Sequence, residues 1–371
     1  MEEQQPIRVA HIVGKMVGGG VEAFIMNYYR NIDRTKIQFD FIIDSDSKVV
    51  PREEIEKMGG RIIEVPPYQK FFSYIKELRK ILNENKYKIV HSHLNSLSVF
   101  PLYCAYCEKI PVRIAHSHST TNKKEWKKNL VKNILRPFSK VFATHYFACS
   151  EHAARWLFGN KSFDNGSVII ISNAINIFHF AYDERIREKI RKDLDIENKV
   201  VFGHIGRFVK QKNHAFLIKI FREILFKKND SILLLVGEGP LEEDIRNIVK
   251  EYDIQNKVIF LGIRDDVNEI MQALDYLVFP SLYEGLGIVA IEAQCSNLPT
   301  IVSNNVPKDV LLTDNILSFP LNWNEKKWAE SIIGNEFEKR KNMCSVIADS
   351  GFDITVEKDI LQKIYIELDG N

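Results

Sequence analysis

Two glutamates, Glu284 and Glu292, stand eight positions apart on either side of a glycine-containing turn. An apolar strand is expected just before this turn, at residues 276–279, and an amphipathic helix just after it. A helix start bared by glycine offers unpaired N–H groups and the positive end of the helix dipole, which suits a phosphate. A carboxylate on each side suits hydroxyl groups. The pattern therefore predicts a ligand with phosphate in its middle and polyols at both ends, which is the layout of a sugar nucleotide.

Two cations, Arg207 and Lys212, follow the strand expected at residues 200–205 and precede a helix that begins near Asn213. At a strand end, such a pair can hold a diphosphate, with arginine as a planar fork and lysine as a compact charge. It would also stabilise a departing nucleotide diphosphate. Solvated loop charges are the alternative, and the position at the strand end favours the ligand.

Three glycines at residues 18–20 lie between the first expected strand and the first expected helix. Because glycine has no Cβ, Gly19 and Gly20 would let the backbone approach a ligand. A tight turn without a ligand explains this cluster equally well. Each glutamate also has an ordinary explanation, since Glu284 could pair with a helix dipole and Glu292 could face solvent. Taken together, the glycines, the cation pair and the two glutamates favour the ligand.

Short β-branched runs alternate with helical patterns along nearly the whole chain. Helices are predicted, for example, at residues 21–31, 71–83 and 96–107. Apolar runs separated by helices predict parallel strands covered on both faces, and two such series predict two doubly wound sheets. The series breaks near residues 172–183, where turn residues gather. Because ligands of such sheets bind beyond the carboxyl ends of the strands, we expect the two sheets to face each other across a substrate cleft. Strands are predicted at residues 7–13, 39–43, 61–64, 89–91, 113–116, 146–149 and 168–171, and then at 200–205, 231–236, 258–261, 276–279, 300–302 and 317–319.

The composition fits a soluble protein of two domains. The chain has 371 residues, of which 45% are hydrophobic and 27% charged, and a net charge of +2, which excludes a generally basic nucleic-acid binder. No apolar run is long enough to span a bilayer, and the polar, acidic N-terminus is not expected to be a signal peptide. Five cysteines, an odd number, favour reduced thiols and a cytoplasmic location.

The chain resembles a family 4 glycosyltransferase of the GT-B fold over most of its length. Glu284 and Glu292 match the family's E-x7-E signature, and further matches lie at residues 19–22, 206–207, 212–213, 236–240 and 280–281. Residues 172–176 resemble the family's usual junction sequence, with serine for proline and alanine for glycine. The resemblance implies an α/β fold of two Rossmann-like domains, an acceptor-side domain at 1–175 and a nucleotide-sugar-binding domain at 176–354. A helix at 355–371 is expected to cross back onto the first domain.

The resemblance also implies a role for each matching residue. Arg207 and Lys212 would hold the donor's diphosphate. Glu284 would bind hydroxyls of the transferred sugar, and Glu292 the ribose hydroxyls. His118 matches the position that approaches the sugar at the reaction centre, so the implied catalytic set is Glu284, His118, Arg207 and Lys212. The implied donor-binding set is Gly19, Gly20, Gly206, Ile263, Arg264, Gly285, Leu286, Gly287, Ile288 and Glu292, with the base near Ile263 and Arg264.

These features predict a glycosyltransferase that moves a sugar from a nucleotide-diphosphate sugar, most simply a UDP-sugar, and the resemblance implies that it retains anomeric configuration. The subgroup that the chain resembles builds capsule or exopolysaccharide, so the expected acceptor is a glycan or a polyprenyl-linked sugar. The resemblance implies a reaction on one face of the sugar, which needs no protein nucleophile. A sugar-nucleotide epimerase of similar architecture and a non-catalytic sugar-nucleotide-binding protein are the alternatives. We expect no cofactor and no metal, because cations and helix ends take over the metal's role.

Other patterns carry weaker signals. Two H-x-H pairs, His91 with His93 and His116 with His118, are read as core or strand-end residues rather than metal ligands, and we expect each pair to place one imidazole on either side of its strand. An Asp-Ser-Asp at residues 44–46 mimics the metal-binding D-x-D of transferases with another fold. Cys104 is spaced from a second cysteine as in redox motifs, but its apolar helical setting favours a core position.

A basic segment at residues 123–140 departs from the overall charge balance, with seven cations against one glutamate. Apolar residues recur within it at helical spacing, so it predicts an amphipathic basic face that can lie on an anionic membrane. At about 1 kcal/mol per basic residue near such a surface, several cations would give reversible attachment to the inner face of the cell membrane. Packing of the apolar stripe on the sheet is the alternative. The candidate membrane and acceptor face comprises Lys124, Trp126, Lys127, Lys128 and Lys132.

Overall fold

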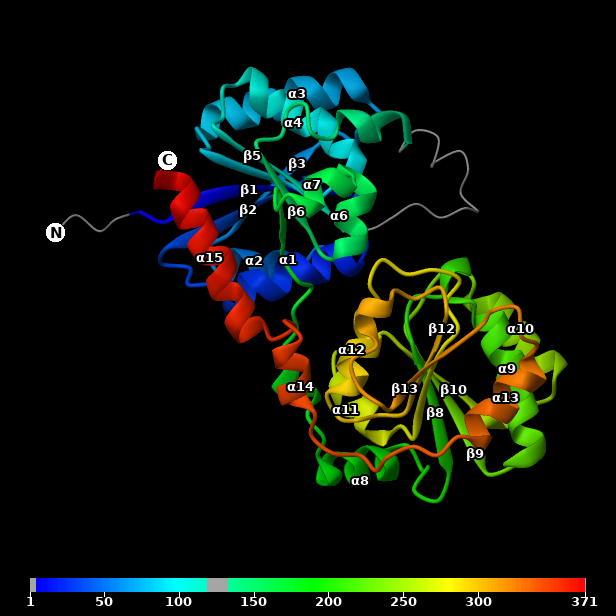
Figure 1. The fold of residues 1–371 in the computed structure, drawn as a ribbon. Coiled ribbons are helices and arrows are strands. Elements are labelled where there is room, and N and C mark those ends of the chain that lie inside the picture. Colours follow the sequence, from blue (N-terminus) through cyan, green and yellow to red (C-terminus); the bar gives the residue numbers. More distant parts are fainter. Residues whose placement is uncertain (1–4, 119–132, 371) are drawn as a thin grey trace. The chain divides into compact units, whose positions relative to one another are not determined.

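The computed structural model describes residues 5–118 and 133–370. The chain folds into two compact units, each of which packs mainly within itself. Unit 1 comprises Met1–Ile175 together with Phe352–Asn371, and unit 2 comprises Asn176–Gly351. Each unit is an α/β sandwich built on a parallel sheet (Figure 1).

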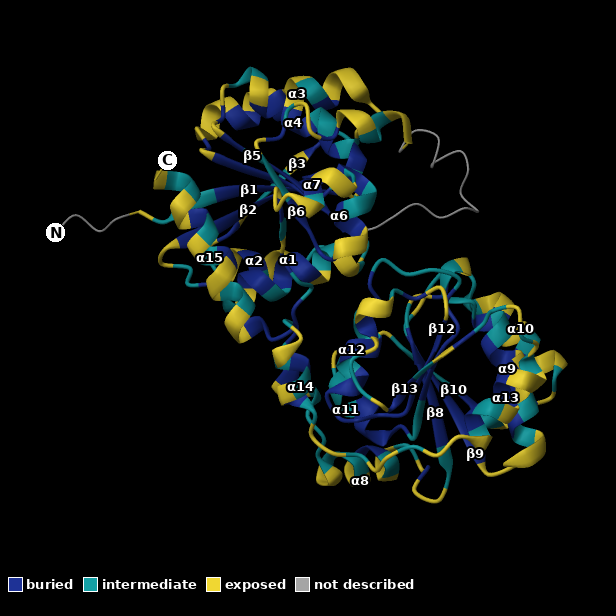
Figure 2. Ribbon diagram, in the orientation of Figure 1, coloured by how far each residue is buried: buried dark blue, intermediate teal, exposed yellow. Residues whose placement is uncertain are grey.

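The sheet of unit 1 has seven parallel strands in the order β3-β2-β1-β4-β5-β6-β7. Strands β2 and β4 are buried from end to end and most of β1 and β5 is buried, because helices cover both faces (Figure 2). The strands are β1 (Ile7–Gly14), β2 (Ile37–Asp44), β3 (Arg61–Val65), β4 (Ile89–Ser92), β5 (Val112–Ser117), β6 (His145–Ala148) and β7 (Val168–Ile170).

Helices cover the two faces of this sheet and bury their apolar stripes on it. In α3, the buried residues Tyr74, Leu78, Ile81 and Leu82 recur at i, i+4, i+7 and i+8, which is one face of a helix. They share a core cluster with residues of α4 and α6, whereas α1 and α15 belong to the cluster on the opposite face. The helices are α1 (Gly20–Asn31), α2 (Arg52–Lys57), α3 (Phe71–Asn85), α4 (Val99–Cys107), α6 (Glu151–Phe158), α7 (Asn160–Asp164) and α15 (Ile354–Gly370), with 3-10 turns η1 (Asn95–Ser98) and η2 (Arg136–Phe138).

The last helix returns to unit 1. Residue Ile175 bridges to Asp353 just before α15 begins, and α15 packs against α1. Its side chains Leu361 and Tyr365 are buried in the same cluster as the strand residues Val9 and Phe39.

The sheet of unit 2 has six parallel strands in the order β10-β9-β8-β11-β12-β13. Its strands are β8 (Val200–Ile205), β9 (Ser231–Val236), β10 (Val258–Gly262), β11 (Tyr276–Phe279), β12 (Thr300–Ser303) and β13 (Ile316–Phe319). Its helices are α8 (Glu184–Asp193), α9 (His214–Lys227), α10 (Glu242–Glu251), α11 (Val267–Ala273), α12 (Ile288–Gln294), α13 (Glu325–Gly334) and α14 (Cys344–Asp349), with 3-10 turns η3 (Ile177–Phe180), η4 (Lys210–Lys212), η5 (Gln255–Lys257) and η6 (Lys308–Val310).

Both sheets reverse their strand order at one point, between β1 and β4 in unit 1 and between β8 and β11 in unit 2. Loops on either side of such a point diverge and leave room for a ligand at the carboxyl ends of the strands. In unit 1 these loops carry residues 15–19 and His93. In unit 2 they carry residues 206–213 and 280–287, which include both motifs that predict phosphate binding.

The predicted strands all occur, with ends that shift by a residue or two; β2, for example, begins at Ile37 rather than at residue 39. The helix predicted over residues 96–107 divides into η1 and α4. Among the described residues, no helix is both long and apolar enough to cross a bilayer.

Candidate functional site

The centre of the candidate site in unit 2 is an ion pair between Lys212 and Glu284. The Lys212 ammonium lies 2.8 Å from a Glu284 carboxylate oxygen, and the two side chains are only 16% and 7% exposed. Gln211 donates from its amide to the second Glu284 oxygen at 3.2 Å. Because β8 and β11 are neighbours in the sheet, the loops that follow them meet, although the two residues lie 72 positions apart. The structure thus places a cation and a carboxylate side by side at the point where the strand order reverses.

Backbone and side-chain bonds fix these two loops to each other. Asn213 adopts a left-handed conformation with a φ of 58° at the start of α9, and its amide donates to the Pro280 carbonyl at 3.1 Å. The N–H of Leu282 donates to the carbonyl of Gln211 at 2.8 Å. The Lys212 ammonium also lies 4.4 Å from the centroid of the Phe279 ring, a cation–π contact. Lys212 is therefore held in place from two sides.

Arg207 is exposed, and its guanidinium forms no ion pair or hydrogen bond with the described residues. Its neighbour Gly206 packs on Lys212, because a Cβ at Gly206 would lie 3.2 Å from the Lys212 Cε. A second glycine, Gly237, packs directly against this turn, since a Cβ there would lie 2.5 Å from the Gly206 carbonyl oxygen. The arrangement brings the free guanidinium of Arg207 into the same loop as the ion-paired lysine.

The turn from Gly285 to Ile288 leads directly into α12. Gly287 has a φ of 96°, which favours glycine, and a Cβ there would lie 3.2 Å from Val306. The N–H groups of residues 285–288 have no acceptor among the described residues. They are the unpaired donors of a helix start, so the turn can bind an anion.

Glu292 lies one helical turn beyond the start of α12 and is partly buried. Burial raises the pKa of Glu292 from 4.5 to about 7. Its carboxylate forms no hydrogen bond with a described residue. It can therefore accept hydrogen bonds from the hydroxyls of a ligand, provided that it is ionised.

The two residues expected near a nucleobase follow β10, at the edge of the sheet. The Ile263 side chain is 70% exposed. Arg264 pairs with Asp266 at 2.6 Å, and both line a cavity of about 270 Å³ between α8 and α11. The structure does not bring these residues into contact with Lys212 or Glu284.

In unit 1, Gly19 is the N-cap of α1 and Gly20 is its first residue. The carboxylate of Glu22 accepts from the N–H groups of Val17 at 2.8 Å and Gly19 at 3.0 Å. The N–H of Gly19 is therefore already paired. A Cβ at Gly20 would meet no atom within 4 Å, so the backbone there faces open space.

His118 follows β5 and is buried. Its ring Nε2 is hydrogen-bonded to His93 Nδ1 at 2.8 Å. Its backbone N–H donates to the side-chain oxygen of Asn95 at 2.7 Å. Burial lowers the pKa of His118 to about 3, so the imidazole is neutral at physiological pH. His93 and Asn95 were not predicted as partners of His118, although the spacing of His91 and His93 in an H-x-H pair was a usable signal.

The expectation that each H-x-H pair faces both sides of its strand is wrong. The rings of His91 and His93 stack with centroids 4.2 Å apart, and those of His116 and His118 with centroids 3.9 Å apart. Side chains alternate along a strand with a period of two, so residues i and i+2 share a face.

Histidines alone form the groups that could share a metal ion within residues 5–118 and 133–370. These groups are His11 with His91 and His93, and His93 with His116 and His118. The Asp-Ser-Asp stretch forms no such group: Asp44 is buried, with its pKa raised to about 6, and Asp46 pairs with Lys15. All five cysteines are free thiols.

The proposed membrane face lies mostly outside the described residues, since this is where Lys124, Trp126, Lys127, Lys128 and Lys132 fall. The remainder of the basic segment is described. Ile134 and Phe138 are exposed there, and Lys140 donates to Ser162 at 3.0 Å.

Comparison with known proteins identifies a family. The family described as Glycosyltransferase Family 4 matches residues 18–177, and that described as Glycosyl transferases group 1 matches residues 186–347. The EpsF protein of Bacillus subtilis (strain 168), whose name assigns it to the glycosyltransferases, is 32% identical over 96% of each chain. An Escherichia coli UDP-Gal:alpha-D-GlcNAc-diphosphoundecaprenol alpha-1,3-galactosyltransferase is 24% identical over 98% of this chain and 97% of its own.

Among solved structures, Anabaena HepE in complex with UDP-glucose superposes with a TM-score of 0.79 at 15% identity. The match covers 97% of this chain and 100% of HepE. Together with the two parallel sheets, this likeness confirms the GT-B fold predicted from the sequence.

Proposed function

Because this chain belongs to the family 4 glycosyltransferases, we propose that it transfers a sugar from a UDP-sugar to a glycan or lipid-linked acceptor with retention of anomeric configuration. The observation that carries the proposal is the ion pair of Lys212 and Glu284 at the strand-order reversal of unit 2. A cation beside a carboxylate matches a ligand in which a phosphate adjoins a hydroxyl-bearing sugar. The UDP-sugar and the lipid-linked acceptor are supported by the named substrates of the E. coli relative.

Each residue then has a role that follows from its charge and surroundings. Lys212 and the free guanidinium of Arg207 bind the diphosphate, together with the unpaired N–H groups of residues 285–288. Glu284 accepts hydrogen bonds from the sugar, and Glu292 from the ribose. As the bond to the leaving phosphate breaks, negative charge grows on the diphosphate, and the fixed cations and N–H groups stabilise it.

Retention fits a site in which the departing phosphate takes the acceptor's proton on the face that it leaves. The acceptor oxygen bonds to the anomeric carbon, the bond to the phosphate oxygen breaks, and the proton passes from the acceptor to that oxygen. Among the described residues of the unit 2 site, Glu284 is tied to Lys212 and Gln211, which suits a hydroxyl-binding role better than that of a nucleophile. In this proposal, the His118 side chain of unit 1 approaches the transferred sugar at the reaction centre.

The test is turnover of the purified protein with a UDP-sugar and a sugar diphosphate lipid acceptor, with proton NMR of the product. We expect the anomeric coupling of the product to match that of the donor, and Glu284→Gln and Arg207→Ala to lower the rate. An inverted product contradicts retention. If the protein binds the UDP-sugar but shows no turnover that either substitution lowers, it is a binding protein. If it isomerises the donor without transferring the sugar, it is an epimerase.

We further propose peripheral contact with an anionic membrane through the basic segment at residues 123–140. The support is its seven cations and the exposed Ile134 and Phe138 at its described end. Co-sedimentation with vesicles containing anionic lipid should fall when Lys124, Lys127, Lys128 and Lys132 are changed to Glu. Equal binding of the variant and the wild type would remove this proposal.

A further inference from the structure

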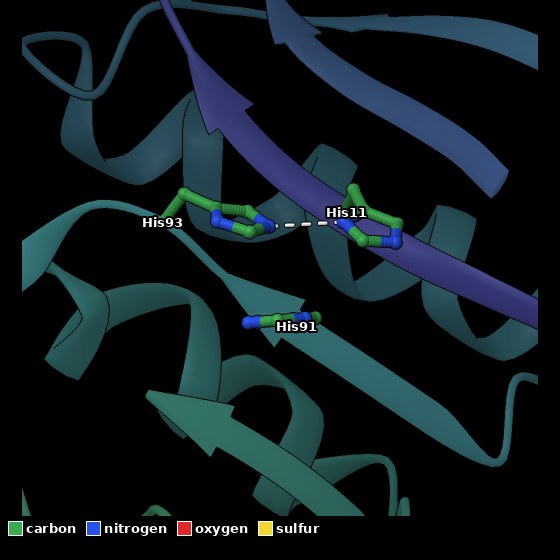
Figure 3. A group of neighbouring side chains, drawn as sticks. All are labelled: His11, His91 and His93. Carbon is green, nitrogen blue, oxygen red and sulfur yellow. Dashed lines mark hydrogen bonds between the residues drawn. The ribbon is translucent and has the colours of Figure 1, made fainter. Parts of the chain in front are cut away.

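Five buried histidines in the sheet of unit 1 form two hydrogen-bonded rows. In the first row, His11 Nδ1 lies 2.9 Å from His93 Nε2, and His93 Nδ1 lies 2.8 Å from His118 Nε2. In the second row, the Tyr365 hydroxyl lies 2.6 Å from His91 Nδ1, and His91 Nε2 lies 2.9 Å from His116 Nδ1. Figure 3 shows the bond between His11 and His93, with His91 beside them and bonded to neither.

The sheet register produces these rows. His11 on β1 is the register partner of His91 on β4, and β5 follows β4 in the strand order. Each H-x-H pair then places its second histidine one step nearer the carboxyl ends of the strands on the same face. In the first row, His93 and His118 each directly follow the last residue of their strand, β4 and β5, at the edge where ligands of such sheets bind, and His118 ends the row.

Burial keeps all five imidazoles neutral, because the pKa of each is lowered from its usual value. A neutral imidazole has one N–H and one bare nitrogen. Each nitrogen–nitrogen bond must contain one proton, so the first row has only two proton arrangements. Either all three rings carry the proton on Nδ1, or all three carry it on Nε2. The proton of His118 is thus set together with those of His93 and His11.

The nitrogen at the outer end of the first row is His118 Nδ1, which is buried and has no hydrogen-bond partner among residues 5–118 and 133–370. A buried nitrogen without a partner is costly, and a hydroxyl group of a ligand would satisfy it. We propose that His93 is a positioning residue, which holds the ring of His118 in one plane and one tautomer so that Nδ1 bonds a hydroxyl of the reacting sugar or acceptor. This inference rests on the proposed function.

The second row provides a matched control. His91 and His93 lie on the same segment, are equally buried, and each bonds two partners, but only His93 contacts His118 through a hydrogen bond. Replacement by phenylalanine keeps a flat ring in the stack and removes both hydrogen bonds. We expect His93→Phe to lower kcat roughly tenfold to a hundredfold, by analogy with the loss when the hydrogen-bond partner behind a metal-binding histidine is removed. His91→Phe should lower Tm similarly and leave kcat within about threefold.

The tautomers can be read directly in the wild-type protein labelled with [15N]histidine, by long-range proton–nitrogen correlation NMR. We expect His11, His93 and His118 to be neutral at pH 7 and to share one tautomer, and His118 to lose that fixed tautomer in His93→Phe. A mixture of tautomers along the row, or equal losses of kcat in both variants, would overturn the inference. So would stoichiometric Zn²⁺ binding that replaces the N–H signals, because the row would then be a metal site. The NMR result does not depend on turnover, so a failed transfer assay leaves it decisive.

Discussion

The raised pKa of Glu292 predicts that donor binding strengthens as pH rises through 7. In its proposed role Glu292 accepts hydrogen bonds from both ribose hydroxyls, and the ionised carboxylate is the stronger acceptor because the protonated form uses one oxygen as a donor. With a pKa of about 7, Glu292 is mostly protonated at pH 6 and mostly ionised at pH 8. The apparent Kd is the intrinsic Kd divided by the competent fraction, so it should be about tenfold higher at pH 6 than at pH 8.

The assay is isothermal titration calorimetry of an intact UDP-sugar at pH 6, 7 and 8. The intact donor is essential, because the terminal phosphate of UDP itself titrates near this range. At pH 7, repetition in buffers of different ionisation enthalpy should show about half a proton released per donor bound. Glu292→Gln should bind weakly at all three pH values and release no proton. A wild-type Kd that is flat between pH 6 and 8, or a pH dependence that survives in Glu292→Gln, would refute the assignment.

The same pKa has a consequence for the free protein. The carboxyl of Glu292 is more easily protonated when folded than when unfolded, so its contribution to stability is full below pH 4.5 and is lost as pH rises through about 7. The shift corresponds to about 3 kcal/mol at most. Donor binding, which favours the ionised form, opposes this loss.

Three further outcomes follow from the structure. Gly20→Ala should leave Tm within about 2 °C of the wild type, since the added methyl group would meet no atom within 4 Å. It should weaken donor binding measured by calorimetry, because the proposed phosphate approaches that backbone. Unchanged binding would remove Gly20 from the site. Gly203→Ala should destabilise unit 2 by about 1–3 kcal/mol in thermal or urea unfolding, because its methyl would overlap the buried Leu274; a neutral effect would contradict the packing of β8. Transfer activity should be unchanged by a chelator, whereas abolition by EDTA with rescue by manganese would show that a metal takes part.

Much of the fold follows from local sequence. Runs such as residues 231–236, apolar and flanked by helical patterns, predict a strand buried on both faces, and β9 is buried throughout. The predicted strands occur with small shifts at their ends. The helix predicted over residues 96–107 begins too early, because residues 95–98 form the 3-10 turn η1, in which Asn95 has a φ of 52°, and α4 begins at Val99. A side-chain bond to the chain beyond β5 holds that turn, and such a bond is invisible to periodicity.

The candidate site was harder to predict because its contacts are long-range. The sequence points separately to Lys212 and Glu284, but their ion pair depends on the pairing of β8 with β11. Gln211, which bonds the same carboxylate, carried no signal of its own. The histidine rows depend on the register of three strands, and the predicted faces are wrong because residues i and i+2 of a strand share a side.

The central claim, that Lys212 binds the diphosphate and Glu284 the sugar, is tested most directly by titrating Glu284→Gln with UDP and with the matching UDP-sugar. Removal of the Glu284 charge frees Lys212 from its ion pair. UDP should therefore bind the variant at least as tightly as it binds the wild type, while the UDP-sugar binds about tenfold or more weakly. An equal loss for both ligands, or no loss for the UDP-sugar, would contradict the account.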